Sequence, residues 1–213
     1  MRKICFVNGS PKEKNSASQY FIDELCKLID SSSYQINEVL VNGVPDYEEF
    51  ADSDALVFVF PLYVDSLPSP VLEFLVNLEQ NIPKSKKAAR VYAVVNCGFF
   101  EGIQNRHAVR IIRNFSDKLG YKWRFGIGIG GGPFIWESRE GIPLSSKVKR
   151  PIYETLAEMA KDIDGPEGTR ENLLVSPKIP RFIYITASNS GWPKSAKAKG
   201  LTKKQLYARP FAK

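Results

Sequence analysis

The apolar positions of the chain alternate between short continuous runs and longer segments with helical spacing. The runs Ile4–Val7, Ala55–Phe60 and Val91–Val95 contain no charged residue. A continuous apolar run without alternation is typical of a strand buried on both faces of a parallel sheet. The segments between the runs repeat apolar residues at intervals of three and four, which is the spacing of a helix with one buried face.

This pattern predicts five strands, each followed by a helix. The predicted strands are Ile4–Val7, Tyr34–Val41, Asp54–Phe60, Ala89–Asn96 and Trp123–Ile129. The predicted helices are Ser16–Asp30, a short turn ending near Asp52, a helix with Val71, Leu72, Leu75, Val76 and Leu78 on its inner face, Asn105–Leu119, and a last long helix over Ile152–Ile163. Such alternation predicts an α/β fold with a doubly wound parallel sheet.

The order expected for this sheet, 2-1-3-4-5, reverses its winding between the first and third strands. Ligands of doubly wound sheets bind beyond the carboxyl ends of the strands at this reversal. The loops that meet there are Asn8–Ser18, Pro61–Ser69 and Asn96–Asn105, and they are the most unusual loops of the sequence. We therefore expect the functional site at this edge of the sheet.

The first of these loops is small and polar and leads straight into a helix. Unpaired N–H groups at a helix N-terminus and the positive end of the helix dipole attract an anion. The further donors are the hydroxyls of Ser10, Ser16 and Ser18, the amide of Asn15 and the charge of Lys12. The loop matches neither the dinucleotide fingerprint nor the P-loop. It indicates a phosphate site, and the alternative is a plain strand-to-helix connection.

The other two loops are suited to a flat ring. Prolines stiffen the second loop by fixing φ, and they hold Leu62 and Tyr63 at the sheet edge. Tyr63 is the natural platform for a heterocycle, although these side chains could instead cap the core. The third loop contains Gly98, which permits close backbone approach, beside the aromatic residue Phe99. One loop for phosphate and two for a planar ring describe a mononucleotide, and a flavin has that shape.

Together the loops resemble the motifs of the flavodoxin-like NAD(P)H-dependent FMN reductases, a superfamily that also contains flavoprotein quinone and azo-compound reductases. The resemblance is carried by Asn8–Lys12 with Ser16–Ser18, by Phe60–Tyr63, and by Asn96–Glu101, and it covers about Arg2–Ile163. It implies a flavodoxin-like fold with bound FMN. The implied FMN contacts are Ser10, Lys12, Ser16, Ala17 and Ser18 for the phosphate, Pro61, Leu62, Tyr63 and Val64 for the isoalloxazine, and Asn96, Cys97, Gly98 and Phe99 for its pyrimidine edge.

The chain departs from the family pattern at two places. Lys12 stands where the family often has arginine, and Ser16–Ser18 replaces a common Asn-Thr pair. Asp65 places a carboxylate near the expected flavin, which would disfavour the anionic reduced form unless the side chain points to solvent.

The resemblance implies an FMN-dependent oxidoreductase that takes hydride from NADH or NADPH and passes electrons through FMN to a small acceptor such as free flavin or a quinone. Flavin chemistry needs little from side chains, so we name no catalytic residue. His107 is expected at a surface or helix end, and Cys97 as a packed, inert thiol. The alternatives are a flavodoxin-type electron carrier, which the basic tail disfavours, and a scaffold without cofactor.

Composition narrows the class of protein. The 213 residues are 43% hydrophobic and 25% charged, as in ordinary globular proteins. No apolar run approaches membrane-spanning length, and the run after Met1 is too short for a signal peptide, so we expect a cytoplasmic protein. Cys5, Cys26 and Cys97 are expected as free thiols. With His107 as the one histidine, no metal site is expected.

The net charge of +7 is concentrated in the tail. Lys178–Lys213 contains nine basic residues and no acidic residue, whereas the remainder has 21 basic and 23 acidic residues. We expect an FMN-binding domain over residues 1–176 and a basic extension over 177–213, with a short helix capped by Thr202. The extension is expected to pack on the body or on the second subunit of a homodimer, and a solvated tail is the alternative. Neither nucleic acid nor a membrane is expected as a partner.

Overall fold

The computed structural model describes residues 1–43, 46–83, 87–165 and 168–208. The chain divides into two compact units, Met1–Lys178 and Ile179–Lys213. Two basic residues of the tail, Arg209 and Lys213, lie outside the described residues.

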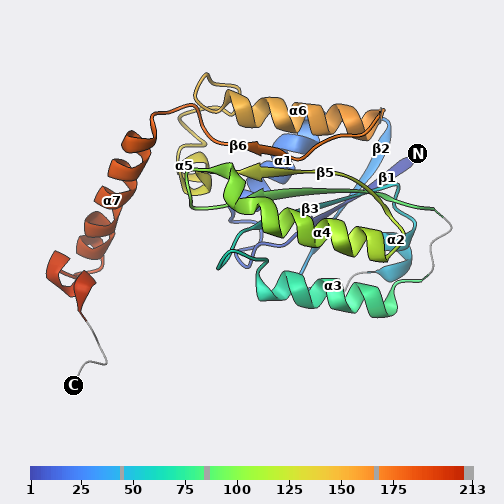
Figure 1. Ribbon diagram of the computed structural model, residues 1–213, viewed down its shortest axis with the longest axis horizontal. Helices are drawn as coiled ribbons and strands as arrows, with labels where there is room; N and C mark the ends of the chain where they lie inside the picture. The colour runs from blue at the N-terminus through green and yellow to red at the C-terminus, as the bar shows by residue number, and fades with distance from the viewer. Residues whose placement is uncertain (44–45, 84–86, 166–167, 209–213) are drawn as a thin grey trace. The chain divides into compact units, whose positions relative to one another are not determined.

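The first unit is built on a parallel sheet (Figure 1). Its strands within the described residues are β1 (Arg2–Asn8), β2 (Tyr34–Leu40), β3 (Ala55–Pro61), β4 (Arg90–Asn96), β5 (Lys122–Ile129) and β6 (Leu173–Val175). Their order is β2-β1-β3-β4-β5-β6, which confirms the predicted winding and its reversal between β1 and β3. The prediction of five strands was wrong in number, because the three-residue strand β6 adds to the edge beside β5.

Helices cover both faces of the sheet (Figure 1). They are α1 (Ala17–Leu28), α2 (Tyr47–Ala51), α3 (Ser69–Asn81), the 3₁₀ turn η1 (Gly102–Asn105), α4 (Arg106–Lys118), α5 (Gly132–Glu137) and α6 (Arg150–Asp164). The apolar side chains of α1 and α6 form a core with one face of the sheet. Those of α3 and α4 form a second core with the opposite face. The result is the three-layer arrangement expected for a doubly wound sheet.

The central strands β3 and β4 are buried almost throughout, as their unbroken apolar runs predicted. Aromatic side chains fill the two cores. Phe58 contacts Phe50 and Phe115 edge to face on one side, with ring centres 6.4 and 6.0 Å apart. Tyr92 and Phe125 make the same contact at 5.7 Å on the other side. These geometries are favourable for aromatic pairs and help to fix the two layers.

The inner face of α3 differs from the prediction. Phe74 is buried there, whereas Leu72 and Val76 have 52% and 46% of their surface exposed. The buried positions Val71, Phe74, Leu75 and Leu78 follow the i, i+3, i+4, i+7 spacing of one helical stripe. Leu72 and Val76 fall outside that stripe, so their assignment to the inner face was wrong.

The three cysteines are free thiols, as expected. Burial raises the pKa of Cys5 to about 12 and that of Cys26 to about 11, and nearby carboxylates add to both shifts. Burial also raises the pKa of Cys97. Because the thiolate is the reactive form of cysteine, all three side chains are held in their unreactive form at neutral pH.

The second unit contains α7 (Arg181–Ala198) and the 3₁₀ turn η2 (Lys203–Tyr207). α7 was not predicted, and it carries Pro193 in its interior. Thr202 and Gln205 form a reciprocal capping box at the start of η2, which confirms the predicted cap. Trp192 is 69% exposed. No helix of the described chain is both long and apolar enough to cross a bilayer.

Gly130, at the end of β5, provides a test of this packing. A Cβ added there would overlap the backbone oxygen of Phe100, which cannot move independently of its loop. We expect Gly130→Ala to lower the free energy of unfolding by about 3 kcal/mol, measured by urea denaturation. Gly141→Ala is the control, because an added Cβ meets no atom within 4 Å there. Equal stabilities of the two variants would contradict the close packing of these loops.

Candidate functional site

The carboxyl ends of β1, β3 and β4 border a cavity of about 330 Å³. This volume lies in the range of small-molecule sites. The sheet register brings the three predicted loops together here, because Asn8 pairs with Val59 and Pro61 pairs with Asn96. Twelve of the fourteen residues expected to bind FMN line the cavity: Ser10, Lys12, Asn15, Ser16, Ala17, Ser18, Pro61, Leu62, Tyr63, Asn96, Cys97 and Gly98. Their role in binding stays a prediction.

The first loop is organised by Asn8, a buried residue that the sequence analysis did not assign to the site. Its side-chain oxygen accepts a hydrogen bond from the backbone of Ser10 at 3.0 Å. Its amide nitrogen donates to Gln19 at 2.8 Å and to the carbonyl of Glu13 at 3.4 Å. Asn8 therefore ties the end of β1 to the loop and to α1. The only sequence signal is a polar amide at the end of an apolar strand.

Within the part of the chain that the structure describes, the N-terminus of α1 supplies donors without a partner. Ser16 caps the helix, accepting from the N–H of Gln19 at 3.2 Å and donating to the carbonyl of Glu13. The N–H groups of Ala17 and Ser18 come first in the helix and have no carbonyl partner within it. The hydroxyl of Ser18 is buried and makes no hydrogen bond with any described residue. A buried hydroxyl without a hydrogen-bond partner costs free energy, so a ligand that accepts a hydrogen bond from Ser18 would be stabilised.

The second loop turns tightly at the rim of the cavity. Tyr63 and Ser66 exchange backbone hydrogen bonds of 3.0 Å across a two-residue turn. Val64 and Asp65 at its tip have φ of 49° and 58°, a left-handed conformation that is unusual for valine. Val64 is 98% exposed and does not line the cavity. The other predicted residues of this loop, Pro61, Leu62 and Tyr63, do line it. Asp65 is exposed beside it.

The second and third loops are joined by a hydrogen bond of 2.7 Å from the Leu62 N–H to the Asn96 carbonyl. The Asn96 amide in turn donates to the carbonyl of Phe60 at 3.3 Å. The Cys97 sulfur accepts from the Asn105 amide at 3.5 Å and is buried, as expected for a packed thiol. Phe99 is half exposed and lies outside the cavity lining.

A fourth wall comes from α5, which the sequence analysis did not predict as a helix. Gly131 precedes it with φ of 69°, and Pro133 lies in its first turn. The N–H of Gly132 donates to the Cys97 carbonyl at 2.8 Å, which fixes α5 against the third loop. Trp136 lines the cavity, and the guanidinium of Arg139 lies 3.6 Å from its ring centre. The missed signal is the glycine–proline pair that begins a helix.

A buried lysine holds α5 in place. The Lys149 ammonium donates to the carbonyls of Ile142 at 2.7 Å and Ile135 at 3.2 Å, and it lies 5.9 Å from the ring centre of Phe134. No carboxylate of the described chain forms an ion pair with it. Burial lowers the pKa of Lys149 to about 8, although Glu24 opposes the shift. The lysine thus joins α5 to the start of α6.

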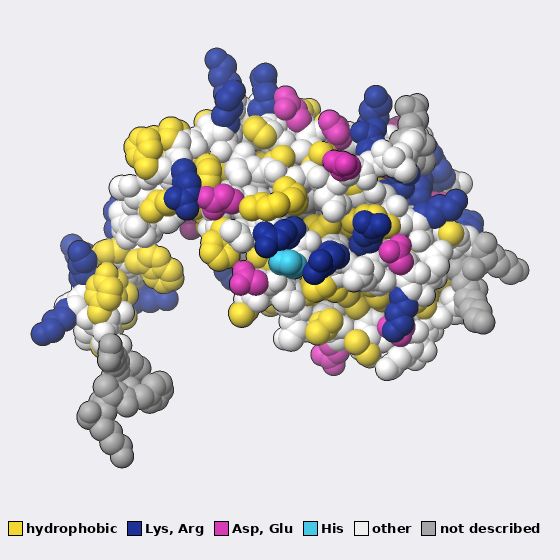
Figure 2. Space-filling model, in the orientation of Figure 1, with side chains coloured by type: hydrophobic (Ala, Val, Ile, Leu, Met, Phe, Trp, Pro, Cys, Tyr) yellow, Lys and Arg dark blue, Asp and Glu magenta, His cyan; other side chains and the backbone are white. Residues whose placement is uncertain are grey.

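His107 lies on the surface of α4 and not in the cavity. It is exposed, and its Nδ1 is 3.3 Å from a guanidinium nitrogen of Arg110. Figure 2 shows it among Lys and Arg side chains on this face of the molecule. This placement confirms the expected surface position.

Comparison with solved structures identifies the architecture. An FMN-dependent NADH-azoreductase from Bacillus anthracis str. Ames Ancestor, solved with FMN, matches at a TM-score of 0.53 and 14% identity over 76% of this chain and 99% of its own. A Streptococcus pneumonia TIGR4 flavodoxin matches at 0.57 and 12% over 78% and 99%. The fold is flavodoxin-like. This result confirms the predicted fold class.

A third flavodoxin-like structure, the NAD(P)H:quinone oxidoreductase from Methanothermobacter marburgensis, matches at 0.57 and 11% identity over 79% of this chain and 98% of its own. Azoreductases, a quinone oxidoreductase and flavodoxins are thus the kinds of structure that this chain is similar to, in agreement with the predicted resemblance. No protein-family model matches the sequence, and no curated protein matches it significantly.

The α5 wall generates a pH prediction. Folding lowers the Lys149 pKa from 10.5 to about 8, so its buried charge reduces stability below pH 8, and this cost is relieved as the pH rises from about 8 toward 10.5. Over this window the unfolding free energy of the wild type should rise relative to Lys149→Met, by at most about 1.4 kcal/mol per pH unit. Urea unfolding of both proteins at several pH values measures the difference.

Lys147→Met is the matched control, because it removes an exposed lysine from the same connection. Its stability should follow that of the wild type across the window. Parallel pH profiles for wild type and Lys149→Met would show that the Lys149 ammonium is not desolvated.

Proposed function

We propose that the protein is an FMN-dependent oxidoreductase that takes hydride from NADH or NADPH and passes electrons to a small acceptor such as free flavin or a quinone. The observation that carries the proposal is the buried hydroxyl of Ser18, which has no partner among the described residues, beside the first N–H groups of α1. These donors lie in the same cavity as an apolar and aromatic wall. A phosphate attached to a flat ring would contact the donors at one end of the cavity and the apolar wall at the other.

At the phosphate end the chain offers mostly neutral donors. Ser10, Lys12, Asn15 and Ser18 line this part of the cavity, with the first N–H groups of α1. Lys12 is the one cation of the described lining, so backbone amides and hydroxyls would carry most of the phosphate binding. The Ser16 hydroxyl is already used as the helix cap, so this residue would contribute through its place in the loop.

At the ring end the cavity has two apolar sides. Pro61, Leu62 and Tyr63 form one side, and Pro133 and Trp136 of α5 form another. Backbone groups of Asn96 and Gly98 border the same space and could meet the polar edge of the ring. The exposed position of Asp65 at the turn tip keeps this carboxylate directed to solvent, which removes the electrostatic conflict that its sequence position raised.

FMN, when bound, supplies the hydride and electron chemistry itself. The chain would position its ring, anchor its phosphate and exclude water from the two sides that Leu62 and Trp136 form. The Cys97 thiol stays protonated because burial raises its pKa, so it takes no part as a nucleophile. We therefore assign no general acid or base to the protein.

Fold relatives of similar TM-score include both reductases and flavodoxins, so the electron-carrier alternative shares the same site. We favour the enzyme, because electron carriers of this kind present acidic surfaces to basic partners, and the C-terminal extension of this chain is strongly basic. A cytoplasmic homodimer, with the basic extension packed on the body or on the partner, is part of the same proposal.

FMN titration into the cofactor-free protein tests the site. Ser18→Ala removes a donor from the proposed phosphate contact, so FMN affinity should fall about tenfold while riboflavin affinity stays unchanged. Ser116→Ala is the matched control, because the Ser116 hydroxyl is also buried and unpartnered among described residues but does not line the cavity. Flavin fluorescence quenching measures both affinities.

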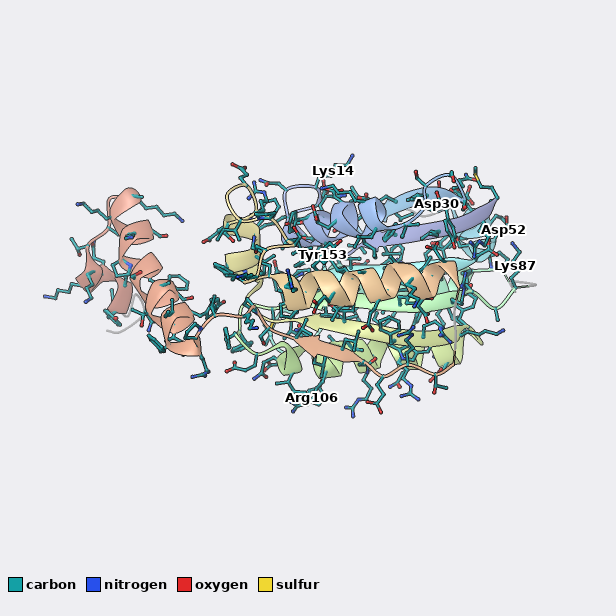
Figure 3. The ribbon with its side chains drawn as sticks, turned by 90° about the horizontal axis from the view of Figure 1, so that it is seen from above. Lys14, Asp30, Asp52, Lys87, Arg106 and Tyr153 are labelled. Carbon is teal, nitrogen blue, oxygen red and sulfur yellow. The ribbon has the colours of Figure 1, made fainter. Side chains whose placement is uncertain are left out.

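Lys12→Ala, compared with Lys14→Ala, tests the charge in the same way. Both lysines lie in the first loop, but only Lys12 lines the cavity, and Lys14 is labelled in Figure 3. No uptake of FMN, or equal affinities for Ser18→Ala and Ser116→Ala, would overturn the proposal.

Anaerobic addition of NADPH or NADH to the FMN-loaded protein separates the enzyme from the carrier. We expect the yellow absorbance of the bound flavin to bleach within seconds, because an enzyme must accept hydride directly. A subsequent addition of a quinone should restore the colour. Flavin that stays oxidised with both nucleotides would favour the carrier.

A further inference from the structure

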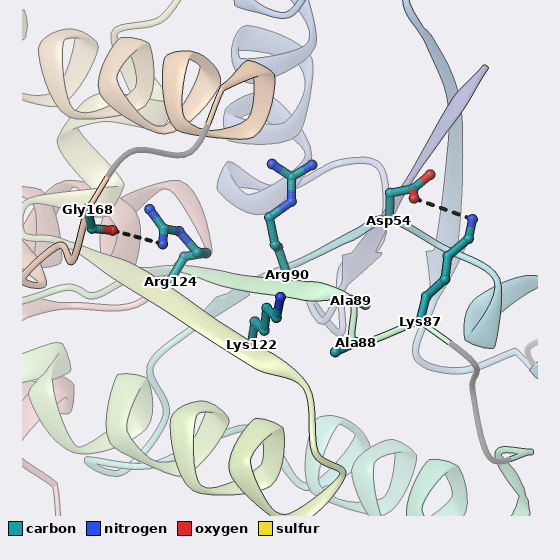
Figure 4. Close-up of a pocket in the computed structure, with 8 residues that line it drawn as sticks. All are labelled: Asp54, Lys87, Ala88, Ala89, Arg90, Lys122, Arg124 and Gly168. Atoms are coloured by element: carbon teal, nitrogen blue, oxygen red, sulfur yellow. Dashed lines mark hydrogen bonds and ion pairs between the residues drawn. The ribbon is translucent and has the colours of Figure 1, made fainter.

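The amino ends of β3, β4 and β5 border a second cavity, of about 410 Å³. The amino and carboxyl ends of parallel strands lie at opposite edges of a sheet, so this cavity is separate from the proposed flavin site. Its charged lining consists of Asp54, Lys87, Arg90, Lys122 and Arg124 (Figure 4). Four cations therefore face one carboxylate.

Two of these cations are cross-strand neighbours. Arg90 begins β4, Lys122 begins β5, and the sheet register pairs them. Paired residues of neighbouring strands point to the same face of a sheet, and like charges in that position are destabilising. Neither side chain forms an ion pair with a described residue, and the one side-chain hydrogen bond of Arg90 goes to the carbonyl of Ile163 at 3.0 Å.

Arg124 is a third cation on this face, and it lies at a shift in the strand register. Val91 pairs with Trp123 but Tyr92 pairs with Phe125, which leaves Arg124 as the extra residue of a bulge. The Arg124 side chain lies on the α6 side, where it forms hydrogen bonds of 2.8 and 2.9 Å with Asp162. Lys122 and Arg124 are two residues apart in β5 and therefore point to the same face, so three cations of β4 and β5 lie on the α6 side.

Two described carboxylates at or beside the cavity, Asp54 and Asp162, are already paired. Asp162 is fully buried, and although burial opposes its ionisation, hydrogen bonds from Arg124 and Tyr92 hold its pKa below the usual value. Asp54 accepts from the backbone of Lys3 at 2.8 Å and pairs with Lys87 at 3.4 Å. Lys87 also lies 3.5 Å from Asp52, and Figure 3 shows both.

A purely structural role explains two of the cations that line this cavity, Arg90 and Arg124. Arg90 donates to a carbonyl at the C-terminal end of α6, where a cation is favoured by the helix dipole. Arg124 neutralises Asp162. Lys122 has neither of these two roles, yet it is paired with Arg90 across the strands. Arg90 also has guanidinium nitrogens that form no hydrogen bond with a described residue. An anion between Arg90 and Lys122 would convert their repulsion into two attractions.

We propose that this cavity binds a small phosphate-bearing molecule, with its phosphoryl oxygens between Arg90 and Lys122. The planar guanidinium suits two oxygens at once, and the ammonium adds a point charge. The cavity volume is that of a small-molecule site, which favours a small ligand over a macromolecular surface. The site does not depend on FMN, so it would act as a second, regulatory or structural, anion site.

Calorimetric titration of the full chain with pyrophosphate tests the site, with sodium chloride at equal ionic strength as the reference. Lys122→Gln should weaken pyrophosphate binding at least tenfold. Lys147→Gln is the control, because it removes an exposed lysine elsewhere in the same unit. Ser18→Ala, which alters only the first cavity, should leave the affinity unchanged, so this result is independent of the proposed flavin function.

Three results would overturn the proposal. They are equal effects of pyrophosphate and chloride, equal affinities of Lys122→Gln and Lys147→Gln, and a loss of binding in Ser18→Ala instead of Lys122→Gln. Lys122→Glu gives a second measurement, because it replaces the like-charge pair with an opposite one. It should raise the midpoint of thermal unfolding without anions and abolish the rise that pyrophosphate causes. A lower midpoint for Lys122→Glu would contradict the repulsion itself.

Discussion

The candidate site depends on the hydrogen-bond register of the sheet at the point where its winding reverses. β1 and β3 are neighbours, but α1 leaves the first strand toward one face and α3 leaves the other strand toward the opposite face. The loops after these strands therefore separate and leave a crevice between them. The pairs Asn8–Val59 and Pro61–Asn96 set how far each loop projects. A shift of one residue in this register would turn each side chain of β3 to the opposite face of the sheet, and the loops would no longer enclose the cavity.

Much of this arrangement could be predicted from the sequence, because it follows from local signals or from apolar patterns that repeat along the chain. Unbroken apolar runs mark strands that are covered on both faces, and the helical stripes mark the layers that cover them. Parallel alternation then leaves few possible topologies. The loops follow from the topology, which is why the sequence alone predicts that residues as far apart as Ser18, Tyr63 and Cys97 lie around one cavity.

The features that the sequence did not reveal depend on tertiary contacts. β6 has three residues, too few for a periodic pattern, and it exists because the edge of β5 offers free hydrogen-bonding groups. α5 has six residues, and its last carbonyls are satisfied by side chains from elsewhere, Lys149 among them. The exposure of Leu72 and Val76 depends on how α3 is rotated against the sheet. The pairing of Arg90 with Lys122 depends on strand register and on a bulge, neither of which composition encodes.

The protonation of the three cysteine thiols has a consequence when the protein is exposed to oxygen. Reduced flavins react with oxygen to give hydrogen peroxide, which oxidises the deprotonated sulfur of cysteine to sulfenic acid. Cys97 borders the cavity in which we propose that FMN binds, but burial keeps its proton in place and Asn105 donates a hydrogen bond to its sulfur. Cys5 and Cys26 are protected in the same way. With FMN bound as proposed, peroxide formed at this edge of the sheet would therefore leave the three cysteines unmodified.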